Sequence, residues 1–222
     1  MPVAVLQLGE RIRAERARKG ISLRALARSV GLSPSLISQI ETGKCQPSVS
    51  TLYAITTALG VSVQDVFGEA AAPGGPVTDR EAAGQVVVPA RPGQPARPAH
   101  GDAPEIGGPV VCPGQRDVLE LDSGVIWQRL GRVPGSHVDF LLVSYAPGGC
   151  SSPAGRLMRH VGTEYGYLIH GELTVMLGSR PHRLTPGDAV SFASMTPHSY
   201  RNEGTVPAVG VWFVAGSDGP QR

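Results

Sequence analysis

The 222-residue sequence lacks the features that mark several common classes of protein. No apolar run approaches the roughly 20 residues that cross a bilayer. The N-terminus also lacks the basic and then apolar segments of an export signal. Cys45, Cys112 and Cys150 form no CxxC pair, which fits a reducing compartment and argues against a zinc ribbon. We therefore expect a cytoplasmic protein with no membrane partner.

Signatures of common catalytic and nucleotide sites are missing as well. The pairs Gly107–Gly108 and Gly148–Gly149 lie outside any strand-to-helix context, so they do not indicate nucleotide binding. No nucleophile elbow or serine triad is apparent. Cys45 or Cys150 could sense redox state, although ordinary thiols are the simpler interpretation. Function must therefore be sought in other groups of residues.

The formal net charge of +2 is small but unevenly distributed. Residues 1–68 hold eight basic and four acidic side chains, so this segment is positive and the rest of the chain is slightly negative. A basic unit fits contact with phosphates, although many solvated helices carry a similar charge. The apolar content of 41% argues for globular folding.

Residues 6–68 have the pattern of five short helices, each closed by a glycine. Four of these helices would begin at a serine, whose side chain accepts a hydrogen bond from a free backbone N–H group. These serines are Ser22, Ser33, Ser48 and Ser62. Ser62 and Asp65 also have the spacing of a capping box. The sequence therefore predicts a compact helical domain.

The third predicted helix, from Ser33 to Gly43, is amphipathic. Leu36, Ile37 and Ile40 recur at helical spacing and would face the core, which leaves a polar face of short side chains. Most amphipathic helices are purely structural, so this pattern alone does not assign a function.

The segment ISLRALARSVGLSPSLISQIETGKCQPSVSTLYAITTALGVSVQDVF closely resembles the XRE-type helix-turn-helix domain, the lambda-repressor-like fold. The resemblance implies that the Ser33 helix enters the major groove of operator DNA. It also implies that Arg16 and Glu41 form a semi-buried structural ion pair. The positions it assigns to base edges are Ser35, Ser38 and Gln39, and those it assigns to phosphates are Arg24, Ser33, Thr42 and Lys44.

Residues 69–115 differ in character, because nine prolines and eight glycines interrupt any apolar periodicity between Glu69 and Arg116. We interpret this stretch as a linker, with one strand at Gln85–Val88. It would separate a helix-turn-helix domain at residues 1–68 from a second domain at residues 116–222.

The second domain has the pattern of a β protein. Branched or alternating apolar runs recur between turn signals, at residues 117–121, 125–130, 138–145, 165–169, 172–177, 182–184, 189–192 and 208–214. Strands at this density predict a closed or double-layered barrel. The phrases HVGTEYGYLIHGELTVMLG, LTPGDAVSF and PHSYRN resemble the two motifs of a cupin, the small jelly-roll barrel. The expected fold class is a five-helix lambda-repressor-like domain followed by an all-β cupin.

The cupin resemblance implies a metal site at His160, Glu164 and His198, but Met158 stands where the family normally places another histidine. Two histidines and one carboxylate could still hold one divalent ion, which would be Fe, Zn, Mn or Ni. The same groups could instead bind an organic effector, or they could be polar side chains that fill a barrel mouth. We assign Met158, Tyr165 and Tyr200 to the effector pocket.

Two functions follow from these resemblances. The first is a homodimeric transcriptional regulator, expected to be a repressor, that binds double-stranded operator DNA and senses a small molecule in its cupin domain. The second is an enzyme, because a helical domain before a cupin also resembles the iron-dependent epoxidase that makes fosfomycin. The polar residues of the Ser33 helix and the Arg16–Glu41 pair favour the regulator.

Overall fold

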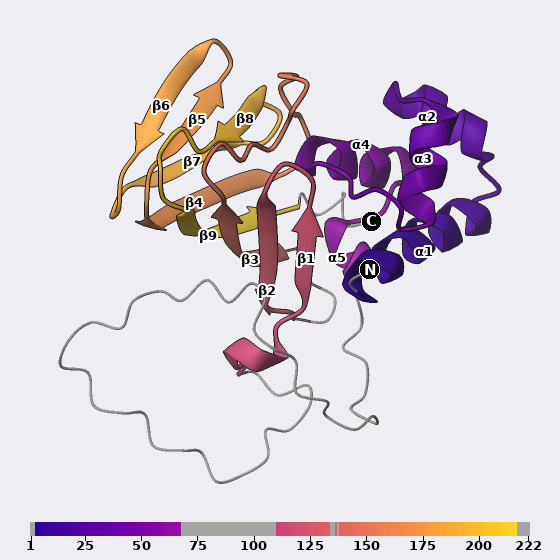
Figure 1. Ribbon diagram of the computed structural model, residues 1–222, viewed down its shortest axis with the longest axis horizontal. Helices are drawn as coiled ribbons and strands as arrows, with labels where there is room; N and C mark the ends of the chain where they lie inside the picture. Colours follow the sequence, from indigo (N-terminus) through magenta and orange to yellow (C-terminus); the bar gives the residue numbers. More distant parts are fainter. Residues whose placement is uncertain (1–2, 68–109, 134–135, 137, 217–222) are drawn as a thin grey trace, which may run out of the picture.

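The computed structural model describes residues 3–67, 110–133, 136 and 138–216. A helical domain and a β domain lie against each other (Figure 1). The strand expected at Gln85–Val88 and most of the expected linker lie outside the described residues. The order of a helical domain followed by a β domain is as the sequence predicts.

The helical domain contains α1 (Val3–Arg18), α2 (Leu23–Val30), α3 (Pro34–Glu41), α4 (Val49–Leu59) and the single-turn α5 (Val63–Val66). The side chains of Ser22, Ser33, Ser48 and Ser62 each accept a hydrogen bond from the backbone at the start of a helix. The predicted caps, including the Ser62–Asp65 capping box, are therefore confirmed. None of the helices in the described ranges is long and apolar enough to cross a membrane.

The helical core fixes α3 against α1. Ile37 and Ile40 of α3 are buried, and Gly9 of α1 approaches α3 so closely that a Cβ there would lie 2.3 Å from the Ile40 carbonyl oxygen. Beside this contact Arg16 forms two hydrogen bonds with Glu41, at 2.6 and 2.8 Å. Since the Glu41 carboxylate is almost fully buried, the pair is structural, as the sequence predicts.

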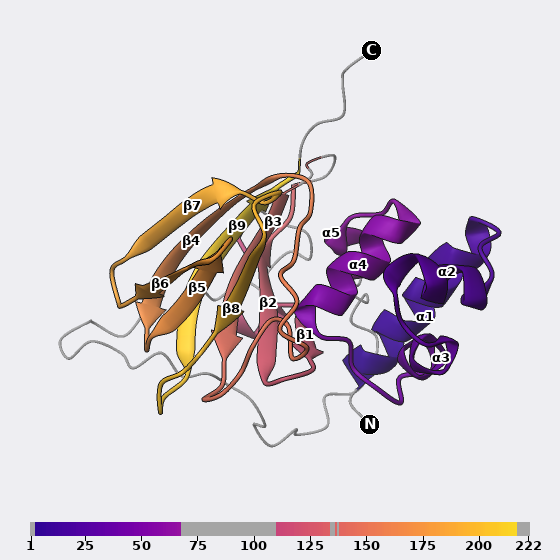
Figure 2. The same ribbon diagram turned by 90° about the horizontal axis from the view of Figure 1, so that it is seen from above.

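The β domain consists of two antiparallel sheets that face each other (Figure 2). The six-stranded sheet has the order β1-β2-β3-β9-β4-β7, and the three-stranded sheet has the order β6-β5-β8. The strands are β1 (Val118–Leu121), β2 (Val125–Gly131), β3 (Val138–Tyr145), β4 (Thr163–His170), β5 (Leu173–Leu177), β6 (Arg180–Leu184), β7 (Ala189–Ala193), β8 (His198–Arg201) and β9 (Ala208–Ala215). The sequence prediction missed β8, which is only four residues long.

Alternation along the strands decides which side chains reach the interior. On the central strands Leu141, Glu164 and Trp212 point inward and are buried, while their chain neighbours Phe140 and Tyr165 point outward and are exposed. The inward row thus places one carboxylate, Glu164, in an otherwise apolar interior.

Helix α4 joins the two domains. Its first turn donates a hydrogen bond from Ser50 N to Ser151 O (2.9 Å), and the preceding Pro47 carbonyl accepts one from Asp122 N (3.0 Å). Tyr53, one turn further on, packs its ring against Trp127 of β2. Helices α2 and α3 lie on the far side of α4 from the sheets (Figure 2). Helix α4 therefore contacts both the interior of the β domain and α2, the first helix of the helix-turn-helix pair.

Candidate functional site

The polar face of α3 is open to solvent. Ser35 and Gln39 are exposed one turn apart, and the Gln39 amide donates to the Ser35 hydroxyl at 3.4 Å. Ser38 is partly exposed beside them. These groups can donate to and accept from base edges, and a glutamine amide pairs in two places with adenine. The structure thus keeps the three predicted base-reading residues on one accessible face.

The residues predicted to contact phosphates surround this face and differ in whether their side chains already form hydrogen bonds within the protein. Arg24 and Lys44 are exposed, and neither forms an ion pair with another residue in the described ranges. The Ser33 hydroxyl caps α3 by accepting from Leu36 N, and the Thr42 hydroxyl donates to Ser38 O at 2.8 Å. Arg24 and Lys44 are therefore cations whose donors are accessible to a phosphate, while Ser33 and Thr42 shape the ends of the helix.

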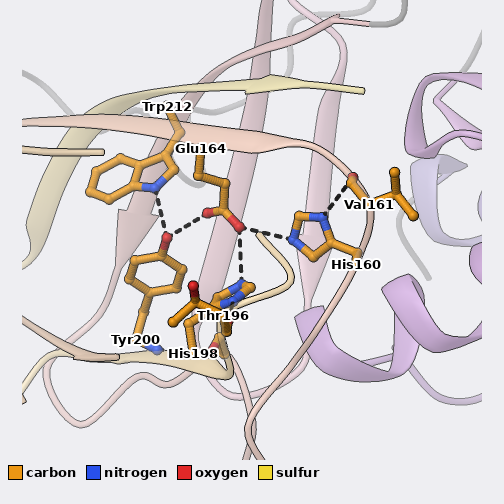
Figure 3. A network of polar contacts seen from close by, with 8 residues as sticks. His160, Val161, Glu164, Thr196, His198, Tyr200 and Trp212 are labelled. Atoms are coloured by element: carbon orange, nitrogen blue, oxygen red, sulfur yellow. Dashed lines mark hydrogen bonds and ion pairs between the residues drawn. The ribbon is translucent and has the colours of Figure 1, made fainter. Parts of the chain in front are cut away.

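A second site lies in the β interior, where three ligand atoms converge (Figure 3). The Nε2 atoms of His160 and His198 lie 2.9 and 3.0 Å from Oε1 of Glu164, and all three side chains are buried. His160 precedes β4, Glu164 lies on β4, and His198 begins β8. Residues from two sheets thus meet at one point.

Backbone carbonyls set the tautomer of both imidazoles. Nδ1 of His198 lies 2.8 Å from the Thr196 carbonyl oxygen, and Nδ1 of His160 lies 3.4 Å from the Val161 carbonyl oxygen. A carbonyl can only accept, so each Nδ1 carries the proton and each neutral ring keeps a lone pair on Nε2. This is the arrangement in which histidine binds a metal ion.

The converging atoms lack ordinary hydrogen bonds. Nε2 of His160, Nε2 of His198 and Oε1 of Glu164 are all buried, and none has a hydrogen-bond partner of good geometry among the described residues. Two imidazole nitrogens and one carboxylate oxygen that converge in this way fit a shared cation, because ligands about 2.1 Å from one ion lie about 3 Å apart at right angles.

The other carboxylate oxygen of Glu164 is held by a chain of donors. Tyr200 of β8 donates its hydroxyl proton to Glu164 Oε2, and Trp212 of β9 donates from its indole nitrogen to the Tyr200 oxygen at 3.1 Å. Burial and the neighbouring carboxylate raise the pKa of Tyr200 well above its usual value, so the phenol stays protonated. These contacts fix Glu164 with one oxygen free for a ligand.

Beside Glu164 lies a small cavity of about 20 Å³, which is room for little more than one water molecule. Met158, Tyr200 and Trp212 line it from the β domain, and Val49 and Tyr53 line it from α4. The Tyr53 ring is stacked on the His160 ring, with centroids 4.0 Å apart and planes within 2°. The helical domain therefore forms one wall of the site.

Tyr53 also lines a larger groove of about 340 Å³ between the two domains. His160 lies in the wall of this groove but not of the small cavity, whereas Glu164 lines the cavity but not the groove. The stacked Tyr53–His160 pair thus stands between the groove and the Glu164 carboxylate.

Comparison with known proteins agrees with this architecture. A helix-turn-helix domain family matches residues 7–66, and a cupin domain family matches residues 141–214. The chain therefore combines a helix-turn-helix domain with a cupin domain. It is 26% identical over 196 residues to the HTH-type transcriptional regulator PuuR of Escherichia coli, and this alignment covers 87% of the chain and 86% of PuuR.

A solved structure shares the fold of this helix-turn-helix cupin protein. An HTH_3 family transcriptional regulator from Vibrio cholerae superposes with a TM-score of 0.61 at 20% identity, over 96% of this chain and 97% of that chain. The hydroxypropylphosphonic acid epoxidase of S. wedmorenis covers 97% of this chain and 100% of its own at 19% identity, with a TM-score of only 0.40. The latter likeness is too weak to bear on activity.

The structure corrects one predicted pocket residue and adds another. Tyr165 is half-exposed on the outside of the cupin domain, because its neighbour Glu164 points inward and side chains alternate along β4. Met158 and Tyr200 do line the cavity. Sequence reasoning missed Tyr53, whose only signal was an aromatic residue within the helix-turn-helix segment, where it reads as an ordinary core residue.

Proposed function

We propose that the protein is a sequence-specific DNA-binding transcriptional regulator, and that it acts as a repressor in the cytoplasm. The observation that supports this most directly is the exposed polar face of α3, where Ser35 and Gln39 are accessible. The cations Arg24 and Lys44 lie exposed beside it and form no ion pair with any residue that the structure describes. In this role α3 lies in the major groove, Ser35, Ser38 and Gln39 contact bases, and the surrounding residues contact phosphates.

We further propose that the regulator binds DNA as a homodimer. One helix-turn-helix unit makes too few contacts for high specificity, so two copies would read half-sites about one helical turn apart. Footprinting on genomic fragments selected by the purified protein tests this directly. We expect two protected major-groove segments spaced by about 10 base pairs, and a single short protected segment would contradict the dimer.

The cupin site, in our proposal, holds one divalent metal ion through His160, Glu164 and His198. The unpartnered lone pairs that converge on one point support this proposal. Such an ion would supply a Lewis-acidic centre to which an oxygen- or nitrogen-bearing molecule could bind. The protein's own groups orient the ligands, through the carbonyls behind each imidazole and the Tyr200 hydroxyl behind the carboxylate.

Elemental analysis of protein purified without chelator tests the metal. We expect about one equivalent in the wild type and a loss of stoichiometric metal in His198→Ala. His182→Ala is the matched control, because His182 is an exposed histidine on β6. Absence of stoichiometric metal in the wild type would contradict the proposal, and an equal loss in both variants would exclude His198 as a ligand.

Effector sensing would work through Tyr53. The inner cavity of about 20 Å³ cannot hold an organic molecule, so a larger ligand reaches Glu164 only if the wall moves. Two wall residues, Val49 and Tyr53, lie on α4, which also packs against α2 of the DNA-binding unit. A ligand that displaces Tyr53 would therefore shift α4, and a coupling of ~1 to 3 kcal/mol would change operator affinity several-fold or more.

An oxygenase is the alternative function, because two histidines and one carboxylate also suit non-haem iron. A substrate would have to displace Tyr53 from the small cavity, as an effector would, so turnover and operator binding are what distinguish the two functions. Turnover of a phosphonate with Fe(II) and oxygen would favour the enzyme. Operator binding without any turnover would favour the regulator.

A further inference from the structure

The outer surface of the six-stranded sheet is unusually apolar. Side chains that point away from the three-stranded sheet are mostly aromatic or aliphatic, and several are substantially exposed. The exposed ones are Val118, Phe140, Tyr165, Tyr167, Ile169 and Phe213, and the partly buried ones among them include Ile126, Leu130, Leu142 and Val211. We call this surface the outer face. A monomer in water normally breaks up such a surface with charges.

The centre of the outer face is a row of aromatic rings across three strands. Phe213 of β9 is directly opposite Phe140 of β3 and Tyr165 of β4. Its ring lies 6.1 Å from the Phe140 ring and 6.3 Å from the Tyr165 ring, both in edge-on arrangement. All three residues are substantially exposed, with exposed fractions of 39% for Phe140, 39% for Phe213 and 51% for Tyr165. Rigid aromatic side chains of this kind dominate the energetics of protein interfaces.

Charge is nearly absent from the outer face. Among the outward-pointing positions in the described strands only Glu120, on the edge strand β1, is an acidic or basic residue other than histidine, and His170 lies at the end of β4. Arg116, just before β1, donates to the outward-pointing Gln128 at 3.2 Å, so its cation lies at the same edge. An apolar centre with charges confined to one edge is the anatomy of an interface core and rim. A surface that binds here must itself be apolar and uncharged.

The size of the outer face fits a pair of identical sheets. Six strands about 4.8 Å apart and four to five residues long span roughly 24 by 16 Å, or about 400 Å² of flat area per copy. With the relief of the side chains, two such faces bury about 1,000 Å² together, which is the lower bound for a specific interface. Two copies of this face also match in chemistry, because each presents the same aromatic row to the other.

We infer that the outer face, centred on Phe213, is the surface through which two copies of this chain pair about a two-fold axis, by packing their six-stranded sheets face to face. The inference deepens the proposed homodimer by naming its surface. The helix-turn-helix domain contacts the inward side of the sheet through Tyr53 and the edge strand β1 through α1, and the polar face of α3, which is exposed, takes no part in these contacts.

Sedimentation equilibrium in the absence of DNA tests the inference apart from the regulatory function. We expect the wild type to have twice the chain mass of 23.2 kDa, and Phe213→Glu to raise the dimer dissociation constant by about 100-fold or more. Met195→Glu is the matched control, because Met195 is an exposed apolar residue outside the outer face, and it should leave the constant unchanged. A wild-type monomer, or a Phe213→Glu dimer of undiminished strength, would overturn the inference.

Hydroxyl-radical footprinting of the wild type provides a test that needs no variant to fold. On dilution from dimer to monomer, Phe140, Tyr165 and Phe213 should become several-fold more reactive, while Met195 should not change. If the aromatic residues are protected in the monomer as well, another segment of the same chain covers the face and the inference is wrong. A dimer that fails to bind DNA would overturn the proposed function and leave this surface intact.

Discussion

Asp139 makes the stability of the protein depend on pH in an uncommon direction. It lies near the start of β3 in the wall of the groove between the domains, and its Oδ1 atom is buried with no hydrogen-bond partner among the described residues. Burial, with a smaller contribution from the Asp65 carboxylate, raises the pKa of Asp139 to about 7, against the opposing effect of Arg129. The folded protein therefore holds a proton that the unfolded chain has released by pH 5.5.

The sign and size of the pH dependence of the free energy of unfolding follow from the raised pKa of Asp139. The folded-state pKa of an acid lies above its unfolded value, so the stabilisation is complete below about pH 4 and is lost as pH rises through about 7. At pH 5.5 the group is about 1.5 units below its folded pKa, which corresponds to about 2 kcal/mol, and at pH 8.5 the contribution is close to zero. Because Asp139 is partly exposed to solvent, which screens its charge, we expect a contribution of about 1 to 2 kcal/mol to the free energy of unfolding.

Asp139→Asn isolates this contribution. The free energy of unfolding is measured in urea for wild type and variant at pH 5.5, 7.0 and 8.5, and the difference between the two proteins removes the titration of the groups that they share. The stability of the variant relative to wild type should rise by about 1 to 2 kcal/mol from pH 5.5 to pH 8.5. Asp122→Asn is the control, since Asp122 is an exposed aspartate on the turn after β1, and it should show no such trend. A difference between Asp139→Asn and wild type that does not change with pH would refute the reasoning.

Three further predictions concern contacts within and between the domains. Arg16→Ala leaves the Glu41 carboxylate buried and unpaired, so it should lower the free energy of unfolding by about 3 to 5 kcal/mol in urea titrations, and an effect below 1 kcal/mol would contradict a structural pair. Gly9→Ala places a methyl group against the Ile40 carbonyl oxygen and should lower the free energy of unfolding by about 1 to 3 kcal/mol in the same assay, and an unchanged stability would contradict a fixed contact between α1 and α3. Tyr53→Ala uncovers the His160 ring, so bound metal should pass to a chelator several-fold faster than in the wild type or in Tyr53→Phe, and equal rates would mean that Tyr53 does not guard the site.

Much of the helical domain follows from sequence because its signals are local. Ser22, Ser33, Ser48 and Ser62 mark helix starts by a hydrogen bond that spans only three residues, and the structure makes that bond at each of them. By contrast β8 has four residues, and the two that point inward, His198 and Tyr200, are polar or amphipathic. A strand this short gives no apolar alternation, so its residues are recognised only through the cupin motif.

The errors at the site have two different causes. The wrong placement of Tyr165 was avoidable, because assigning Glu164 to the interior of a strand sends the next side chain to the other face. The role of Tyr53 was not predictable, because its contact with His160 joins residues more than 100 positions apart in different domains. The periodicity of α4 indicates that Tyr53 is buried, but it does not say against which surface.

The central claim is that the polar face of α3 reads DNA, and fluorescence anisotropy with a labelled operator fragment tests it most directly. We expect salt-dependent binding by the wild type, a loss of about 1 to 3 kcal/mol of binding free energy in Gln39→Ala with relaxed preference at one base pair, and unchanged affinity in Gln7→Ala. Gln7 is the matched control, because it is an exposed glutamine on α1 of the same domain. Equal affinities of Gln39→Ala and wild type for operator and mutated operator would contradict the claim.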